Sequence, residues 1–294
     1  MLEAGIGVIG GSGLYQMEGL ENPEECEIQT PFGKPSDAII RGTLSGRPVF
    51  FLARHGRGHR LLPTELNHRA NIWALKSLGV RWIVSVGAVG SLKEELPPRH
   101  IVIPDQCVDQ TSRRAEHTFF GEGIVAHISF GEPYSGPLRE LLIEAVREEG
   151  LPLHDRGTYT TMDGPAFSTR AESEVNRQLG HDVIGMTNAP EAKLAREAEI
   201  ALATLAMVTD YDCWKEEEED VTVDLVLGHL RANAENAQRI VAKVIQRIPR
   251  DPVWAEHQAL EYAILTEKSL WPEPTKRKLG PILHRFLSET EGSH

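Results

Sequence analysis

The sequence contains few cysteines for its size. Only three occur among 294 residues, at Cys26, Cys107 and Cys213. Because their number is odd and they lie far apart, they exclude a disulfide framework and a cysteine-rich metal site. Sparse cysteine usage is typical of a reducing compartment. We therefore expect a cytoplasmic protein.

Basic residues are also scarce. The chain has 31 Lys and Arg against 43 Asp and Glu, which gives a formal net charge of −12. Nucleic acids and anionic membranes bind basic surfaces, so this balance excludes a general binder of either. A small anion is still compatible with a local basic site. No apolar run has membrane-spanning length, and the first residues lack a basic region ahead of an apolar stretch, so we expect neither a membrane span nor a secretion signal.

The remaining composition is that of an ordinary globular protein. Apolar residues make up 40% and charged residues 25%, and the 26 Gly and 18 Pro are spread along the chain. The length is sufficient for one large α/β domain or two smaller ones. We find no internal repeat or linker, and we expect one domain.

Short apolar, β-branched runs alternate with longer amphipathic segments. The runs predict strands: IGVI near residue 6, RPVFFLA at 47–53, RWIVSVGAV at 81–89, HIVIPD at 100–105 and IALATLAMVT at 200–209. The longer segments predict helices at 64–79, 137–150, 168–180, 189–199 and 222–248, with one more around 256–268 before a Pro-rich stretch at 271–274. This alternation predicts an α/β fold with a central sheet, and ligand sites at the strand ends.

Glycine-rich segments follow two of the predicted strands. Gly5, Gly7 and Gly10 fit the dinucleotide pattern G-x-G-x-x-G, but they lie within the strand-like run instead of after it, which argues against a dinucleotide site. The end of that run, GGSGLY, offers backbone N–H groups and the Ser12 hydroxyl to an anion. SVGAVGSL at 85–92 offers similar backbone groups. The alternative for both segments is a tight, closely packed turn.

The segment FLARHGRGHR places Arg54 and His55 after another strand. The planar guanidinium of Arg suits bidentate binding of phosphate oxygens. Histidine phosphatases also carry Arg-His-Gly after a strand, but their pattern continues with Arg and Pro where this chain has Gly58 and Arg60. A phosphatase site and a basic surface loop remain alternatives to a phosphate-binding site.

Hydroxyl and amide residues precede two predicted helices. By spacing alone, Ser168, Thr187 and Asn188 are interpreted as N-caps. The acidic run 216–220 is interpreted as a solvated turn and helix start, where negative charge is favourable.

Two aspartates, Asp210 and Asp212, end a buried strand with Tyr211 between them. A carboxylate in such a place can accept from an amino group or, when protonated, donate to a ring nitrogen. Capping of a turn is the alternative.

Taken in order, these segments resemble one family. VIGGSGLY, TPFGKPS, RHGRGH, LPTELNHRANIWALKSLGV, VGSL, DGPAFSTRAES, GMTNAPEAKLARE and VTDYDCWKE are similar to segments of the 5′-methylthioadenosine phosphorylases, in the trimeric type of the purine nucleoside phosphorylase superfamily. The resemblance runs from about residue 5 to residue 246 and continues only in outline beyond 250. It implies a single α/β domain with a central mixed β-sheet flanked by helices. It divides the chain into a phosphorylase domain over 1–250 and a helical extension of that domain over 251–294.

The resemblance also implies an activity. Inorganic phosphate, as co-substrate, would cleave 5′-methylthioadenosine to adenine and 5-methylthioribose 1-phosphate, with no cofactor and no metal. The partners would be small molecules and further copies of the chain in a homotrimer, not nucleic acid or membrane. The alternative within the superfamily is a phosphorylase for purine nucleosides or methylthioinosine, which carry 6-oxopurines. From other classes, a phosphatase and a non-catalytic nucleoside-binding protein remain open.

Site residues are implied by the same resemblance. Phosphate would be held by Ser12, Arg54, His55, Gly87, Ala88 and Thr187. The nucleoside would be held by Phe167, Met186, Asp210, Tyr211 and Asp212, with Asp210 as the general acid toward the purine ring. Specificity would come from Ser168, Val223, Val226, Leu227 and, from a neighbouring subunit, His127.

Two residues depart from the family pattern. Gly87 stands where Thr or Ser is usual, and Asn188 replaces a usual Thr. Related enzymes for 6-oxopurines carry Glu and Asn at the positions of Ser168 and Asp210. Ser168 and Asp210 therefore favour a 6-aminopurine, because a carboxylate accepts from an amine and opposes a keto oxygen.

Overall fold

The structure is a computed structural model that describes residues 3–11, 14, 17–215 and 223–288, with the side chains of 223–233 and 288 outside the description. Its strands are β1 (Gly5–Gly10), β2 (Glu21–Cys26), β3 (Ile39–Leu44), β4 (Arg47–Ala53), β5 (Val80–Ser91), β6 (Ile101–Val102), β7 (Gln106–Asp109), β8 (Leu153–His154), β9 (Thr158–Thr161), β10 (Val183–Gly185) and β11 (Ala201–Asp210). Its helices are α1 (His68–Ser77), α2 (Gly136–Glu148), α3 (Arg170–Gln178), α4 (Asn188–Glu197), α5 (Val223–Arg247), α6 (Glu273–Lys278) and α7 (Gly280–Ser288).

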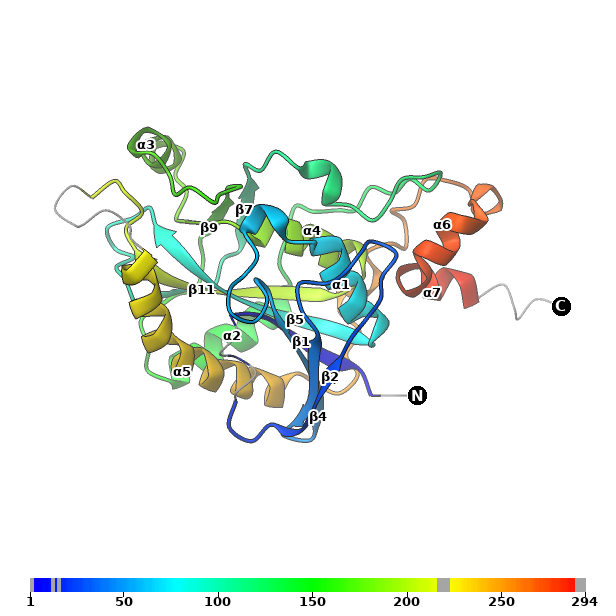
Figure 1. Ribbon diagram of the computed structural model, residues 1–294, viewed down its shortest axis with the longest axis horizontal. Helices are drawn as coiled ribbons and strands as arrows, with labels where there is room; N and C mark the ends of the chain where they lie inside the picture. The colour runs from blue at the N-terminus through cyan, green and yellow to red at the C-terminus, as the bar shows by residue number, and fades with distance from the viewer. Residues whose placement is uncertain (1–2, 12–13, 15–16, 216–222, 289–294) are drawn as a thin grey trace.

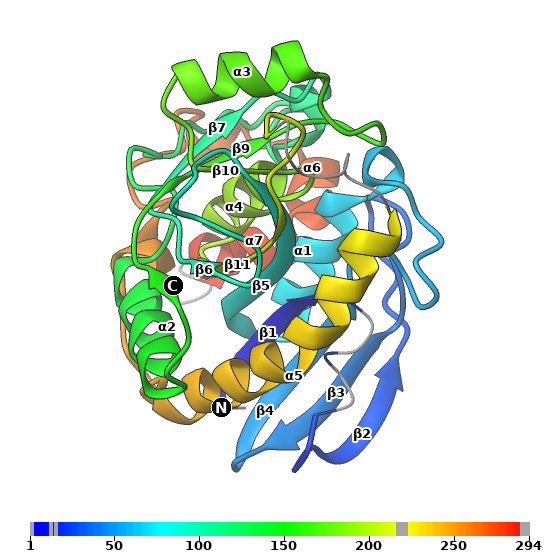
Figure 2. The same cartoon turned by 90° about the vertical axis from the view of Figure 1, so that its left-hand side faces the viewer.

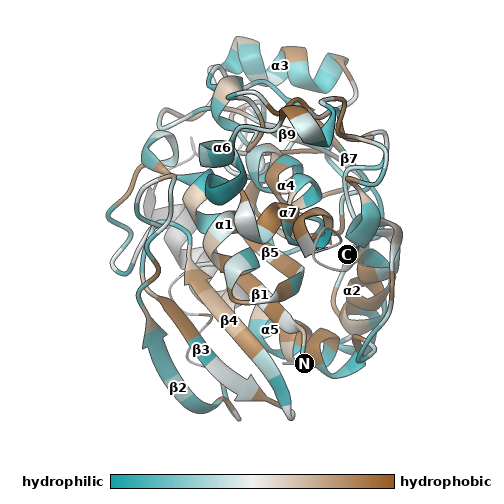
Figure 3. Cartoon of the chain, turned by 90° about the vertical axis from the view of Figure 1, so that its right-hand side faces the viewer, coloured by the Kyte–Doolittle hydropathy of each residue, from teal (hydrophilic) through white to brown (hydrophobic). Residues whose placement is uncertain are grey.

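All described strands belong to one mixed sheet, as expected (Figure 1). Its main order is β2-β3-β4-β1-β5-β10-β9-β7, and β11 also pairs with β5. Strands β1, β4, β5 and β11 run parallel, whereas β2 and β3 are antiparallel to their neighbours. The outer strand β2 is hydrophilic and exposed, while β4 is largely hydrophobic (Figure 3), which suits an edge and an interior strand respectively. The parallel strands bring their carboxyl ends to one edge of the sheet.

Alternating side chains of the central strands bury both faces of the sheet. Trp82 and Val84 of β5 belong to an apolar cluster with α2 and α5, and Ile83 belongs to a second cluster with α1, α4 and α7. Figures 1 and 2 show α5 and α2 on one side of the sheet and α1 and α4 on the other. Burial on both faces explains why these strands appear in the sequence as nearly continuous apolar runs.

The glycines of β1 serve close packing. A Cβ added to Gly5 would lie 2.4 Å from the Phe50 ring, and one added to Gly7 would lie 3.1 Å from Ile83. Both glycines sit within the strand and not in a turn after it. The match to a dinucleotide pattern is therefore a consequence of strand packing.

One prediction of secondary structure is wrong and one is too long. The helix predicted over 256–268 is replaced by short 3-10 turns at Ala255–Gln258 and Lys268–Leu270, because the intervening backbone pairs with residues 125–127. The strand predicted at 100–105 is limited to β6. Helices α6 and α7 lie in and after the stretch interpreted only as Pro-rich.

The C-terminal tail packs on the same core as the rest of the chain. The Trp73 indole N–H donates to the Lys278 carbonyl at 3.1 Å, and the Arg285 guanidinium pairs with Glu199 at 2.7 Å. Trp271 is 7% exposed and joins the apolar cluster that contains α1. The helices α6 and α7 thus cover α1 (Figure 1).

We predict that Trp271→Ala destabilises the whole protein. Truncation of a buried Trp leaves a cavity and costs about 3–5 kcal/mol. Because the tail shares the core, urea unfolding followed by tryptophan fluorescence and by far-UV circular dichroism should shift together as one transition. Separate transitions would make the tail an independent unit.

Candidate active site

Several chain segments with polar side chains meet at the carboxyl edge of the parallel strands. Arg54 directly follows β4, and Asp210 is the last residue of β11. Gly90 of β5 is the register partner of Asp210. The turn from β10 to α4 brings Met186 and Thr187 to the same neighbourhood, because Gly90 also pairs with Ile184 of β10.

Arg54 is buried in a network of hydrogen bonds. Its side chain is 5% exposed, and its Nε and Nη2 donate to the two carboxylate oxygens of Glu191 at 2.5 and 3.0 Å. Nη2 also donates to the Ser85 hydroxyl at 2.8 Å, and Nη1 donates to the Val86 carbonyl at 2.8 Å. Burial alone would raise the pKa of Glu191, but the neighbouring guanidinium holds it below its usual range. The pair is therefore ionised.

These bonds occupy four of the five N–H groups of the guanidinium. The fifth is on Nη1, the atom that would lie 3.8 Å from a Cβ at Gly87. The freely available bidentate fork expected from the sequence is thus already engaged with Glu191. Arg54 can offer a ligand one N–H without disturbing the network.

His55 is held by its own loop. Its Nδ1 lies 2.9 Å from the Leu61 carbonyl, so Nδ1 carries the proton, and its ring stacks on His59 with centroids 4.4 Å apart. Burial lowers the pKa of His55 to about 4. The ring is therefore neutral at physiological pH and presents Nε2 as an acceptor.

The start of α4 is suited to an anion. Thr187 occupies the N-cap position, but its side chain makes no cap hydrogen bond. The helix dipole favours negative charge there, although the Ala189 N–H already donates to the Thr161 hydroxyl at 3.1 Å and Pro190 has no N–H to offer. Asn188 points inward instead, because its amide donates to Thr204 at 2.6 Å and accepts from the Tyr134 hydroxyl. The departure at Asn188 therefore concerns internal packing.

The cap predicted at Ser168 is wrong. Helix α3 is capped by the next residue, Thr169, which forms a reciprocal capping box with Glu172. The Ser168 hydroxyl lies 3.8 Å from the sulfur of Met162, and its carbonyl accepts from Cys213 at 3.2 Å. Ser168 therefore lies one residue before the N-cap of α3 and takes no part in capping the helix.

Asp210 is a buried carboxyl group that pairs with no cationic side chain in the part of the chain that the structure describes. It is 6% exposed, and it accepts from the Thr209 hydroxyl at 2.7 Å and from the Asp212 backbone N–H at 2.8 Å. Burial raises the pKa of Asp210 to about 6. A carboxyl group that titrates near neutral pH can donate as well as accept a proton.

The two residues after Asp210 point in different directions. Asp212 is buried, and burial raises its pKa, while the nearby Ser173 and Ser168 hydroxyls lower it in part. Tyr211 turns away, with its hydroxyl 3.3 Å from the Glu94 carbonyl and its ring against Trp214. Asp212 is therefore directed toward α3 and the residue before it, whereas Tyr211 is directed toward Glu94.

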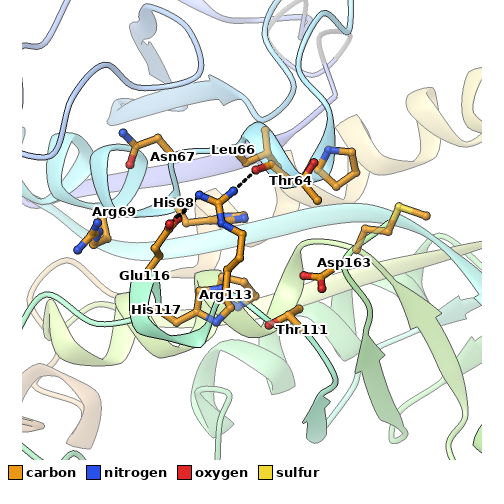
Figure 4. Close-up of a pocket in the computed structure, with 13 residues that line it drawn as sticks. Thr64, Leu66, Asn67, His68, Arg69, Thr111, Arg113, Glu116, His117 and Asp163 are labelled. Carbon is orange, nitrogen blue, oxygen red and sulfur yellow. Dashed lines mark hydrogen bonds and ion pairs between the residues drawn. The ribbon is translucent and has the colours of Figure 1, made fainter. Parts of the chain in front are cut away.

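Met186 lines a cavity. Figure 4 shows this cavity between the start of α1 and the segment 111–117. The cavity is also lined by Thr64, His68, Thr111, Arg113 and Pro190. Phe167 is 42% exposed. His127 lines a separate surface cavity that includes Arg196 and Tyr262, so one chain does not bring it to Met186.

The remaining expected residues cannot be placed. Ser12 and the side chains of Val223, Val226 and Leu227 lie outside the described residues. Within the described part, no three His, Cys, Asp or Glu side chains are grouped to hold a metal ion. No described helix combines the length and apolarity needed to cross a membrane.

Sequence reasoning missed Ser85 and Glu191, which complete the network around Arg54. A serine within an otherwise apolar buried strand was the only local signal for Ser85. Glu191 resembled any acidic residue in the first turn of a helix, where such residues are common. Only their shared contact with Arg54 sets them apart.

Comparison with known proteins identifies the class. Residues 5–246 match the phosphorylase superfamily, and the chain belongs to that superfamily. It is 54% identical over 290 residues to S-methyl-5′-thioadenosine phosphorylase of Synechocystis, covering 97% of this chain and 89% of the relative. It is 55% identical over 289 residues to the protein of that name from Gloeobacter violaceus, covering 97% and 96%.

Solved structures agree with this assignment. A methylthioadenosine phosphorylase from an Antarctic soil metagenomic library superposes with a TM-score of 0.91 and 49% identity, covering 96% of this chain and 100% of the other. Methylthioadenosine phosphorylase from Schistosoma mansoni, in complex with adenine, gives 0.81 and 36%, covering 91% and 100%. The fold and family inferred from the sequence are confirmed.

We predict that Asp210→Asn stabilises the protein above about pH 6. The folded state raises the pKa of this carboxyl group from 3.8 to about 6, so the wild type loses stability as pH rises through that window. The difference corresponds to about 3 kcal/mol at most. Thermal unfolding of both proteins between about pH 4 and 8 should show Asn gaining relative to Asp as pH rises. A cap role would instead make Asn equal or worse at every pH.

Proposed function

We propose that this chain catalyses the phosphorolysis of 5′-methylthioadenosine to adenine and 5-methylthioribose 1-phosphate. The observation that carries the proposal is the buried, titratable Asp210 at the same sheet edge as Arg54 and the start of α4. Such a site can take an anion on one side and a purine on the other. The names of the relatives and structural neighbours support the same substrate.

The chemistry follows from where the charges lie. A phosphate oxygen forms a bond to the anomeric carbon while the bond to the purine nitrogen breaks and its electron pair passes to the base. Protonated Asp210 donates to N7, so the base leaves as neutral adenine, and the carboxylate is later reprotonated from water. The phosphate charge stabilises the cationic sugar in the transition state.

We propose that the base is a 6-aminopurine. The Asp210 carboxyl group can donate to N7 through its protonated oxygen and accept from the exocyclic amine through the other oxygen. A keto oxygen in the place of the amine would face the unprotonated oxygen of Asp210, which is an acceptor, and no hydrogen bond would form. A methylthioinosine or purine nucleoside phosphorylase is the alternative, and it would need a donor there.

We further propose a cytoplasmic homotrimer that needs no metal or cofactor. The position of His127, on a surface cavity away from Met186, supports a role in a neighbouring active site. In this arrangement, His127 of the partner subunit closes the 5′ pocket, and residues 251–294 extend the phosphorylase domain 1–250. Light scattering that finds a stable and active monomer would contradict the trimer.

The proposed activity is tested with a substrate panel. Base release from 5′-methylthioadenosine, adenosine and methylthioinosine is measured with and without phosphate. We expect release that requires phosphate and is fastest with the 6-aminopurine substrates. Equal release without phosphate would indicate a hydrolase, and cleavage of p-nitrophenyl phosphate would favour the phosphatase alternative.

We predict that Asp210→Asn lowers kcat/KM for 5′-methylthioadenosine by about 10²–10⁴-fold, the usual cost of losing a general acid. Methylthioinosine should lose less, because the Asn amide can donate to a 6-keto oxygen. The wild-type kcat/KM should also fall as pH rises through about 6, where Asp210 loses its proton. The Asn variant, assayed in the same buffers, should lack this step and so controls for the ionisation of phosphate itself. An unchanged ratio between the two substrates would remove Asp210 from base recognition.

A further inference from the structure

The hydrogen bonds around Arg54 form a closed ring. Ser85 Oγ donates to Glu191 Oε2 at 2.7 Å and accepts from Arg54 Nη2 at 2.8 Å, while Nη2 also donates to that carboxylate oxygen at 3.0 Å. Glu191 is 2% exposed and Ser85 is 2% exposed. The orientation of the guanidinium is therefore fixed by two buried side chains.

Stability alone does not account for such a network. A buried ion pair costs so much desolvation that it contributes little to stability compared with apolar residues of the same volume. It does fix geometry. Here it fixes which N–H remains for a ligand, the one on Nη1 beside Gly87.

The same network fixes the second side of the anion site. Glu191 lies one turn after Thr187, at the start of α4. A bidentate contact between Glu191 and Arg54 therefore sets the distance between the guanidinium and the N-terminus of this helix. Ser85 adds the strand β5, which carries Gly87 and Ala88.

We infer that Glu191 and Ser85 are positioning residues for phosphate: they hold Arg54 so that a single Nη1–H, beside Gly87, faces the anion. This inference rests on the proposed function. The oxygen atoms of Glu191 and Ser85 are hydrogen-bonded to Arg54 and to each other. The two side chains therefore act on phosphate through Arg54 and not by direct contact.

The first test is Ser85→Ala. Loss of the hydroxyl removes both of its hydrogen bonds, the one from Arg54 and the one to Glu191, and allows the guanidinium to turn. The KM for phosphate should rise about 3–10-fold, which is the scale of a hydrogen bond's net contribution. The KM for nucleoside should stay within about twofold. Ser135→Ala is the matched control, because Ser135 is fully buried and its hydroxyl has no partner among the described residues. It should change neither constant.

The second test is Glu191→Gln, with Glu199→Gln as control. Gln keeps the shape but brings an amide N–H toward the donors of Arg54, so the phosphate KM should rise more than in Ser85→Ala. Glu199 is also a buried carboxylate paired with an arginine, Arg285, and its replacement should lower the melting temperature without raising the phosphate KM. If Glu191→Gln does not fold, Ser85→Ala decides.

Dependence on Arg54 separates positioning from general support of the fold. In an Arg54→Ala background, Ser85→Ala should raise the KM for phosphate by less than about twofold. Contacting residues are coupled, so Ser85 has little effect once the side chain that it holds is gone. The inference would be overturned if Ser85→Ala raised the KM for phosphate and the KM for nucleoside equally. It would also be overturned if Ser85→Ala raised the KM for phosphate by the same factor in the Arg54→Ala background. If the wild-type protein releases base equally well without phosphate, the proposed function is refuted. If the wild type requires phosphate but Ser85→Ala leaves the KM for phosphate unchanged, the inference alone is refuted.

Discussion

The ion pair between Arg54 and Glu191 is the constraint on which the site depends. It joins the end of β4 to the first turn of α4, and through Ser85 and Val86 it also holds β5. These elements come from distant parts of the chain and belong to both the sheet and a covering helix. Because the pair is bidentate and buried, small displacements of any of them break hydrogen bonds that water cannot replace. The anion side of the site is therefore rigid before any ligand arrives.

The purine side uses burial in the opposite way. Asp210 is also buried, at 6% exposed against 2% for Glu191, but no cation among the described residues pairs with it, so burial raises its pKa to about 6. The Arg54 guanidinium keeps the Glu191 carboxyl group ionised, whereas burial raises the pKa of Asp210 toward neutral pH. This contrast between two carboxyl environments gives one sheet edge a fixed charge and a proton donor at once.

The sequence allowed the sheet and most helices to be predicted, because strands buried on both faces and amphipathic helices leave strong local patterns. RPVFFLA coincides with β4, and the run at 200–209 differs from β11 by one residue at each end. The tail was less predictable, since the pairing of residues 263–266 with 125–127 depends on a contact across the chain. Arg54 and Asp210 could be proposed from their places at strand ends. The roles of Glu191 and Asn188 could not, because they depend on which way a side chain turns at the start of α4.

The most direct test of this account is a crystal structure with 5′-methylthioadenosine and sulfate, an unreactive substitute for phosphate. We predict sulfate between Arg54 Nη1 and the start of α4, the adenine ring beside Asp210, and the contact between Arg54 and Glu191 unbroken. The competing position is the cavity beside Met186, which Arg69 and Arg113 line together with Glu116 and Asp163 (Figure 4). Sulfate bound there, or a guanidinium that has left Glu191 to grip the anion with both Nη atoms, would contradict the account.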